Sequence, residues 1–282
     1  MSFKQKYLEY NNGSGGLPDG AFRISASQFN GFMSYPHSWY REQVLKEEGF
    51  KGNTASVLGT IVHGVAAAFV NGDEIDKQAI HDYAHEQAIG NIDVDPHEIL
   101  SQYPLMVETL VNQYIMQNRP TQVEPFVKYE IIPGHFPSGS IDAIQNDMII
   151  DYKTFNALGG TDEKPIIKSA PKTIPMNYKY QLLIYAYIMN KNGHNIERVR
   201  LVYVNRAVDT RRPGKLKADG TPGKELGRYQ APEVTVLTEG VSQDDLDFIE
   251  SVLLLCAETH QMVVEKPNLA YLLYRDYRLK DQ

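Results

Sequence analysis

The segment Gly139–Lys153 reads GSIDAIQNDMIIDYK and combines apolar with charged residues in a way that few segments do. Its pattern predicts two apolar strands around an Asn-Asp turn, with Asp142 in the first strand and Asp151 and Lys153 in the second. Residues two apart project from the same face of a strand, so Asp151 and Lys153 are neighbours. Such charges are unfavourable beside a sheet core unless they compensate one another or bind an ion. Two carboxylates next to an ammonium are the equipment for metal-dependent phosphodiester hydrolysis.

The Asp-x-Lys spacing alone is a weak signal. About two [DE]-x-Lys triplets are expected by chance in a chain of this length, and a second one occurs at Asp162-Glu163-Lys164. The context of Asp151 is what distinguishes it, because two isoleucines precede it and predict a buried strand. The alternative interpretation is an exposed strand edge with an ordinary ion pair.

Composition indicates a globular protein able to bury a substantial core. The chain has 282 residues, of which 42% are hydrophobic and 22% charged. The only cysteine, Cys256, excludes an intramolecular disulfide and any iron–sulfur or zinc site built from cysteines. We see no apolar run of transmembrane length and no apolar signal segment after Met1. These features predict a cytoplasmic protein with no membrane partner.

The formal net charge of −7 disfavours unspecific coating of nucleic acid, but one basic loop stands out. Residues 206–230 hold seven basic and three acidic side chains. The mundane interpretation is a solvated loop. The functional one is a flap that neutralises DNA phosphates. Its candidate DNA-binding residues are Arg206, Arg211, Arg212, Lys215 and Lys217.

The periodicity changes from helical to extended near residue 121. We expect a flexible leader over residues 1–22, a helical layer carrying His63 over 23–120, and a core with the basic loop over 121–282. Capping signals place helix starts at Ser25, Thr54 and Ser242. The expected strands are Val127–Ile132, Gly139–Ile144, Met148–Thr154, Arg198–Asn205 and Glu233–Leu237, with an apolar helix over Asn177–Asn190. This order predicts an α/β fold with a mixed central β-sheet flanked by helices.

An ordered set of motifs resembles the RecB-like exonuclease branch of the PD-(D/E)XK nuclease superfamily. The motifs span about residues 25–190 and are Ser25-Ala26-Ser27-Gln28-Phe29 with Tyr35-Pro36, Gly59-Thr60-Ile61-Val62-His63, Gly139-Ser140-Ile141-Asp142, Ile150-Asp151-Tyr152-Lys153 and Gln181-x-x-x-Tyr185. Several relatives have a cysteine before the proline as part of an iron–sulfur site. Here that residue is Tyr35, and the chain has only one cysteine, so we expect no iron–sulfur cluster.

The resemblance implies a role for each matched residue. Mg²⁺ or Mn²⁺ would be held by His63, Asp142, Asp151 and the backbone carbonyl of Tyr152. Lys153 would orient or deprotonate the attacking water and stabilise the transition state. Gln181 and Tyr185, which share a helix face, would position water, Lys153 or DNA. Glu130 is the preferred further acidic residue, and Glu124 is the weaker option.

The expected function is therefore metal-dependent DNA hydrolysis, most simply by an exonuclease of the phage or recombination and repair type. Two alternatives use the same fold: a structure-specific endonuclease, and a non-catalytic DNA-binding or assembly subunit. A hydrolase of small phosphoesters is disfavoured by the basic loop and by the absence of a glycine-rich phosphate loop. The resemblance also implies DNA as a partner, a recombination or single-strand-annealing protein as a candidate partner, and an oligomer as one compatible state.

Overall fold

The core of the protein is a five-stranded mixed sheet with the strand order β14-β9-β6-β5-β2. Its central strands β6 (Met148–Phe155) and β9 (Arg198–Asn205) run parallel. Parallel strands need a crossover connection, which helix α6 (Met176–Lys191) provides. Antiparallel strands β14 (Val234–Gly240) and β5 (Ala143–Gln145) flank this pair. The predicted α/β fold with a mixed sheet flanked by helices is confirmed.

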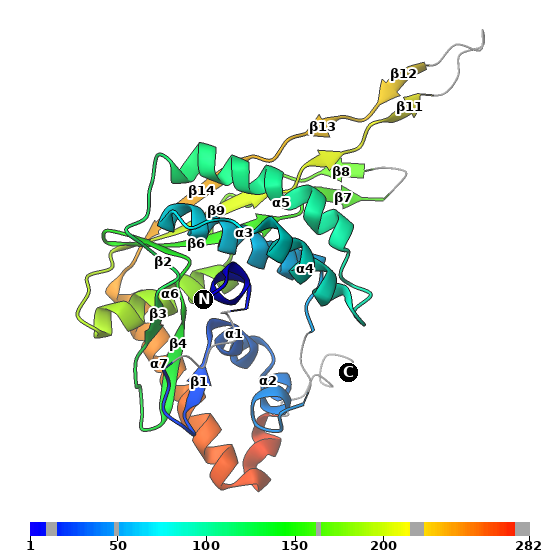
Figure 1. The fold of residues 1–282 in the computed structure, drawn as a ribbon. Coiled ribbons are helices and arrows are strands. Elements are labelled where there is room, and N and C mark those ends of the chain that lie inside the picture. Colours follow the sequence, from blue (N-terminus) through cyan, green and yellow to red (C-terminus); the bar gives the residue numbers. More distant parts are fainter. Residues whose placement is uncertain (10–15, 48–50, 162–164, 215–222, 274–282) are drawn as a thin grey trace.

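The computed structural model describes residues 1–9, 16–47, 51–161, 165–214 and 223–273 (Figure 1). The helical elements besides α6 are η1 Lys4–Leu8, α1 Ala26–Ser34, α2 Pro36–Gln43, α3 Thr54–Asn71, α4 Lys77–Ala88, α5 Pro96–Leu110, η3 Val111–Ile115, α7 Gln243–Glu265 and η4 Pro267–Leu273. The other strands are β1 Phe22–Ile24, β2 Gln122–Val123, β3 Phe126–Lys128, β4 His135–Ser140, β7 Leu158–Gly160, β8 Pro165–Ile167, β10 Val208–Asp209, β11 Arg212–Gly214, β12 Gly223–Leu226 and β13 Tyr229–Gln230. Strands β1, β4 and β3 form a second, three-stranded sheet.

Side chains of β6 alternate between two hydrophobic clusters, as the period of a strand requires. Ile149 packs in a cluster with α1, α2, α6 and α7, whereas Ile150 and Tyr152 pack in a cluster with α3, α4 and α5. Asp151 and Lys153 have the same parity as Ile149 and therefore belong to the α6 face. The central strand thus carries its charged residues on the face that α6 covers.

The predicted N-terminal helical layer is wrong as one layer, because its helices divide between the two clusters. Helices α1 and α2 pack with α6 and α7, while α3, α4 and α5 cover the opposite face of the sheet (Figure 1). An amphipathic stripe shows that a helix buries one side, but it does not show against which partner. Ser25 caps α1 in a box with Gln28, as their spacing predicts, and Ser242 caps α7 as predicted, where the structure adds a box with Asp245. For α3 the cap is Asn53 instead of Thr54.

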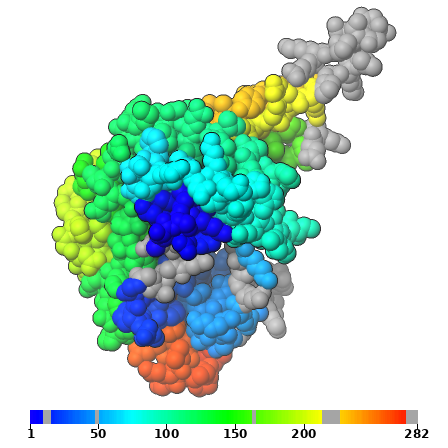
Figure 2. All heavy atoms as spheres, viewed as in Figure 1, coloured from blue at the N-terminus to red at the C-terminus, as the bar shows by residue number. Residues whose placement is uncertain are grey.

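The first nine residues are not the flexible leader that their composition suggests. Phe3, Tyr7 and Leu8 are buried, and η1 seats against α3 and α4 (Figure 2). Gly64 of α3 makes this contact possible, since a Cβ there would lie 2.7 Å from the Tyr7 carbonyl oxygen. The hydrophobic contact anchors the segment, and ion pairs from η1 to Asp73 and Glu86 add to it. Residues 10–15 lie outside the described part of the chain.

Helix α3 is long and apolar enough to cross a membrane when judged by length and composition alone. Half of the apolar window is buried inside the protein. Leu58, Ile61 and Val62 are fully buried in the hydrophobic cluster that α3 forms with α4 and α5. These contacts are those of a core helix.

The predicted strand Gly139–Ile144 is two strands, β4 and β5, separated by Ile141 and Asp142. The chain passes from the three-stranded to the five-stranded sheet at this point. The Asp142 side chain accepts a hydrogen bond from the backbone N–H of Tyr152 at 2.7 Å, which replaces a strand-to-strand contact. Asp142 therefore occupies a bend and not a strand.

Candidate active site

Asp142 links α3 to the central strand. Its Oδ2 lies 3.4 Å from His63 Nδ1 of α3 and accepts the N–H of Tyr152 from β6. In a strand, the N–H and C=O of one residue point to the same side. The Tyr152 carbonyl therefore faces the edge of β6 that Asp142 occupies, beyond the last β5–β6 pair at Ile150. This edge gathers an imidazole nitrogen, a carboxylate and a backbone carbonyl.

Asp151 is the most buried carboxylate of the site. Its side chain is 3% exposed, and its Oδ1 accepts hydrogen bonds from Lys153 Nζ at 2.7 Å and from Gln181 Nε2 at 2.9 Å. Its other oxygen, Oδ2, is buried without a hydrogen-bond partner. A buried carboxylate oxygen without a hydrogen-bond partner destabilises the fold, because it loses its hydration and gains no bond in return. The structure thus leaves an acceptor position open next to an ammonium and an amide.

Glu124, and not the preferred Glu130, lies beside the other predicted site residues, so that preference is corrected. Glu130 is exposed, and its carboxylate accepts the N–H of Gly134 at 2.9 Å, away from the other site residues. Glu124 has a left-handed φ of 52° and donates its N–H to the Asp142 carbonyl at 3.2 Å. Its carboxyl interacts electrostatically with Asp142, His63 and Asp151. The turn between β2 and β3 aims it at the site.

The carboxyl groups of the site compete for a limited positive charge. Burial, reinforced by Asp142, raises the pKa of Glu124 to about 8. Burial also raises the pKa of Asp151 to about 6, although Lys153 opposes this shift. Burial acts in the same direction on Asp142, but His63 and Lys153 outweigh it and hold its pKa below the usual value. In return, Asp142 overcomes the effect of burial on His63 and raises the pKa of that imidazole. The site therefore holds three buried carboxyl groups, of which Glu124 keeps its proton at neutral pH.

This donor set fits a hard divalent cation. No three His, Cys, Asp or Glu side chains in the described ranges are close enough to hold a metal ion as they stand. Asp151 nevertheless has a buried oxygen without a hydrogen-bond partner, and burial, with Asp142 next, raises the pKa of Glu124. Carboxylate and carbonyl oxygens with one imidazole are typical ligands of Mg²⁺ and Mn²⁺. A dication would offset both the burial of these carboxyl groups and their mutual repulsion.

Tyr185 of α6 contacts the backbone where β4 ends. A Cβ at Gly139 would lie 2.7 Å from the Tyr185 hydroxyl oxygen and 3.0 Å from a ring carbon. Burial, and next the charges of Asp142 and Asp151, raise the pKa of Tyr185. The phenol is therefore protonated at neutral pH.

A Gly139→Ala substitution is expected to displace Tyr185 and to lower stability by about 1–3 kcal/mol, because the neighbouring ring is buried and has no room to move. Tyr185→Phe in the same chain should restore part of that loss, since the hydroxyl oxygen is the closest atom. Urea denaturation of the single and double variants measures both effects. Equal stability of Gly139→Ala and the unaltered protein would contradict this contact.

The predicted DNA-binding residues differ in their positions. Arg206 is corrected: it is 6% exposed and forms an ion pair with Glu98 of α5, so it stabilises the fold and is not available to DNA. Arg211 and Arg212 are exposed at the base of the β11–β12 arm, where Arg211 pairs with Asp209 at 2.6 Å. Lys215 and Lys217 lie outside the described residues. The role of these four residues stays a prediction.

One residue near the site was not singled out from the sequence. Tyr178 places its ring 5.2 Å from Lys153 Nζ. It lies three residues before Gln181 and seven before Tyr185, so all three share one face of α6. That spacing could have identified it.

Comparisons with known proteins indicate a family and a fold for the chain. The family profile of the PD-(D/E)XK nuclease superfamily matches residues 23–261. Among solved structures, a candidate exonuclease from Eubacterium rectale is 12% identical, with a TM-score of 0.53 over 93% of this chain and 86% of that one. LHK-Exo in complex with dAMP is 14% identical over 73% of this chain and 92% of that one, but its TM-score of 0.33 is too low to indicate a shared fold. No curated protein sequence matches the chain significantly.

Proposed function

Because the chain belongs to the PD-(D/E)XK nuclease superfamily, we propose that it is a DNA exonuclease dependent on divalent metal ions. The observation that carries this proposal is the proximity of Asp142, at the edge of β6, to Asp151 and Lys153 on its α6 face, where the three charges act on one another. Oxygen ligands and an ammonium at the same point provide both metal binding and charge stabilisation. The metal-site and catalytic assignments below are part of the proposal.

The metal ligands would be Asp142, Asp151 and His63, with the carbonyl of Tyr152 and the carboxylate of Glu124 on the same side. A bound Mg²⁺ or Mn²⁺ would polarise the phosphate and lower the pKa of a coordinated water. His63 is held with Nδ1 toward Asp142, which fixes the orientation of its ring. The hydrogen bond from Tyr152 fixes Asp142 in turn. His63 and Asp142 are thus oriented before any ion binds.

Lys153 would act on the attacking water and on the charge that develops on the phosphate. Its side chain is 19% exposed, so the ammonium is shielded but reachable. Burial lowers the pKa of Lys153, but the charge of Asp151 outweighs this effect and keeps that pKa above its usual value. Lys153 is therefore a cation at neutral pH. Gln181 would hold Asp151 in position through its amide. Tyr185 would donate a hydrogen bond from its protonated hydroxyl.

The finer parts of the proposal are supported by the resemblance of the motifs. These motifs favour the RecB-like branch and an exonuclease of the phage or recombination and repair type, and the single cysteine favours action in the cytoplasm. The candidate exonuclease from Eubacterium rectale shares the fold. DNA is favoured over small phosphoesters because the superfamily is one of nucleases.

The test is digestion of end-labelled linear single-stranded and duplex DNA, and of both circular forms, with Mg²⁺, Mn²⁺ or EDTA. We expect degradation of the linear forms with either metal, intact circles, and no product with EDTA. Cleavage of circles would replace the exonuclease by an endonuclease that uses the same site. Absence of cleavage under all conditions would indicate a non-catalytic DNA-binding or assembly protein.

A further inference from the structure

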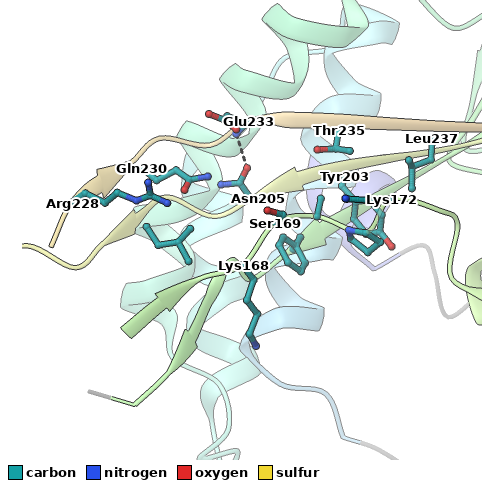
Figure 3. Close-up of a pocket in the computed structure, with 14 residues that line it drawn as sticks. Lys168, Ser169, Lys172, Tyr203, Asn205, Arg228, Gln230, Glu233, Thr235 and Leu237 are labelled. Atoms are coloured by element: carbon teal, nitrogen blue, oxygen red, sulfur yellow. Dashed lines mark hydrogen bonds between the residues drawn. The ribbon is translucent and has the colours of Figure 1, made fainter. Parts of the chain in front are cut away.

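A cavity opens on the face of the five-stranded sheet that also carries Asp151 and Lys153. Its volume is about 440 Å³, within the range of about 300–1,000 Å³ typical of small-ligand sites. The floor is formed by β6, β9 and β14, and the walls by the segment after β8 and by β13 (Figure 3). Lys172 and Tyr203 lie at one end of it, and Arg228 and Gln230 lie at the other (Figure 3). None of the residues assigned to metal binding lines it.

A chain of aromatic rings connects this cavity to the candidate active site. Lys153 Nζ lies 5.2 Å from the Tyr178 ring, and Tyr178 lies 6.3 Å from the Tyr203 ring. Tyr203 contacts Phe155 at 6.2 Å, and both residues line the cavity. In the β6–β9 register, Lys153 is the direct neighbour of Tyr203. A chain-like ligand bound in the cavity could therefore extend directly into the candidate active site.

The charge of the cavity is opposite to that of the chain as a whole. Lys168, Lys172 and Arg228 line it, against one acidic residue, Glu233. These three basic side chains are exposed and form no salt bridge within the described residues. The formal net charge of the chain is −7. Unpaired basic groups around an aromatic floor fit an anion that also carries flat rings.

Resting on the proposed nuclease function, we propose that this cavity binds unpaired nucleotides of the DNA strand next to the scissile phosphate. A base stacks on the partly exposed ring of Phe155, which the buried Tyr203 supports from the neighbouring strand, and Lys172 and Arg228 contact the phosphates. Bases in a duplex face their partners within the stack, so only an unpaired strand can reach this floor. The protein therefore acts on a single-stranded segment, either free or separated from its complement.

The first test measures binding of a fluorescent single-stranded oligonucleotide by anisotropy, in EDTA to prevent cleavage. The variant Lys172→Gln/Arg228→Gln should bind roughly tenfold more weakly at low salt, and the slope of log K against log salt should fall by about 1.4. The matched control is Lys77→Gln/Lys266→Gln, which removes the same charge from exposed positions on α4 and after α7. The control should bind like the unaltered protein. Equal losses in both variants, or none, would overturn the proposal.

The second test detects stacking. An oligonucleotide with abasic residues should bind the unaltered protein at least about fivefold more weakly than the intact one. Phe155→Leu should lower affinity for the intact oligonucleotide but not lower it further for the abasic one. Additive losses would contradict stacking on Phe155. Because binding is measured without cleavage, this proposal and the nuclease function fail in separate experiments.

Discussion

An Asp151→Asn variant is expected to lose metal-dependent DNA cleavage by at least about 10³-fold while it remains folded. The substitution keeps the shape of the side chain and its contact with Gln181 but removes the charge. It also replaces the partnerless Oδ2 by a neutral group, so a cation loses its most deeply buried anionic ligand. The rate is measured by single-turnover digestion of an end-labelled strand, and the fold by circular dichroism.

Metal binding provides an independent measurement for the same variant. A ligand that binds only the folded state raises the unfolding temperature, and the rise grows with the ratio of its free concentration to its dissociation constant. Mn²⁺ should therefore raise the midpoint of thermal unfolding of the unaltered protein, and Asp151→Asn should abolish this rise. The matched control is Asp147→Asn in the turn of the same hairpin, whose carboxylate pairs with Arg198 and lies outside the site. Cleavage by Asp151→Asn at the rate of this control would overturn the assignment.

The sequence was most informative where the chemistry is local. The Asp151-x-Lys153 spacing correctly places both groups on one face of β6, and they form an ion pair there. Ser25 and Ser242 cap the starts of α1 and α7, as predicted. In each case the interacting groups lie within four residues of one another. The period of a strand or helix then determines their relative positions.

The incorrect predictions depend on contacts between distant parts of the chain. Arg206 looked like a DNA-binding residue because its partner, Glu98, lies on a helix far away in the sequence. Glu130 was preferred to Glu124 because alternation places it in a strand, whereas the left-handed φ of Glu124 turns its carboxylate toward the site. The division of the N-terminal helices between two faces has the same cause. Amphipathicity specifies a buried side but not its neighbour.

Lys153→Met is expected to lower the cleavage rate by about 10²–10⁴-fold while metal binding is retained. Methionine has nearly the length of the lysine stem but supplies neither a proton donor nor a charge for the developing phosphate anion. Removing the ammonium also frees Asp151 Oδ1 from its 2.7 Å contact. The Mn²⁺-dependent rise in unfolding temperature should therefore equal or exceed that of the unaltered protein, in contrast to Asp151→Asn.

The control for this variant is Lys179→Met, which removes a lysine of α6 that pairs with Glu239 at 3.1 Å and Asp245 at 3.7 Å, outside the site. It should change stability slightly and leave cleavage unaltered. If Lys153→Met lost both cleavage and the metal-dependent stabilisation, Lys153 would serve to assemble the metal site and not to act on the water or the phosphate. Loss of the cleavage rate alone would assign Lys153 to the chemical step. The carboxylates would then still hold the metal ion, and only the ammonium proposed to stabilise the transition state would be missing.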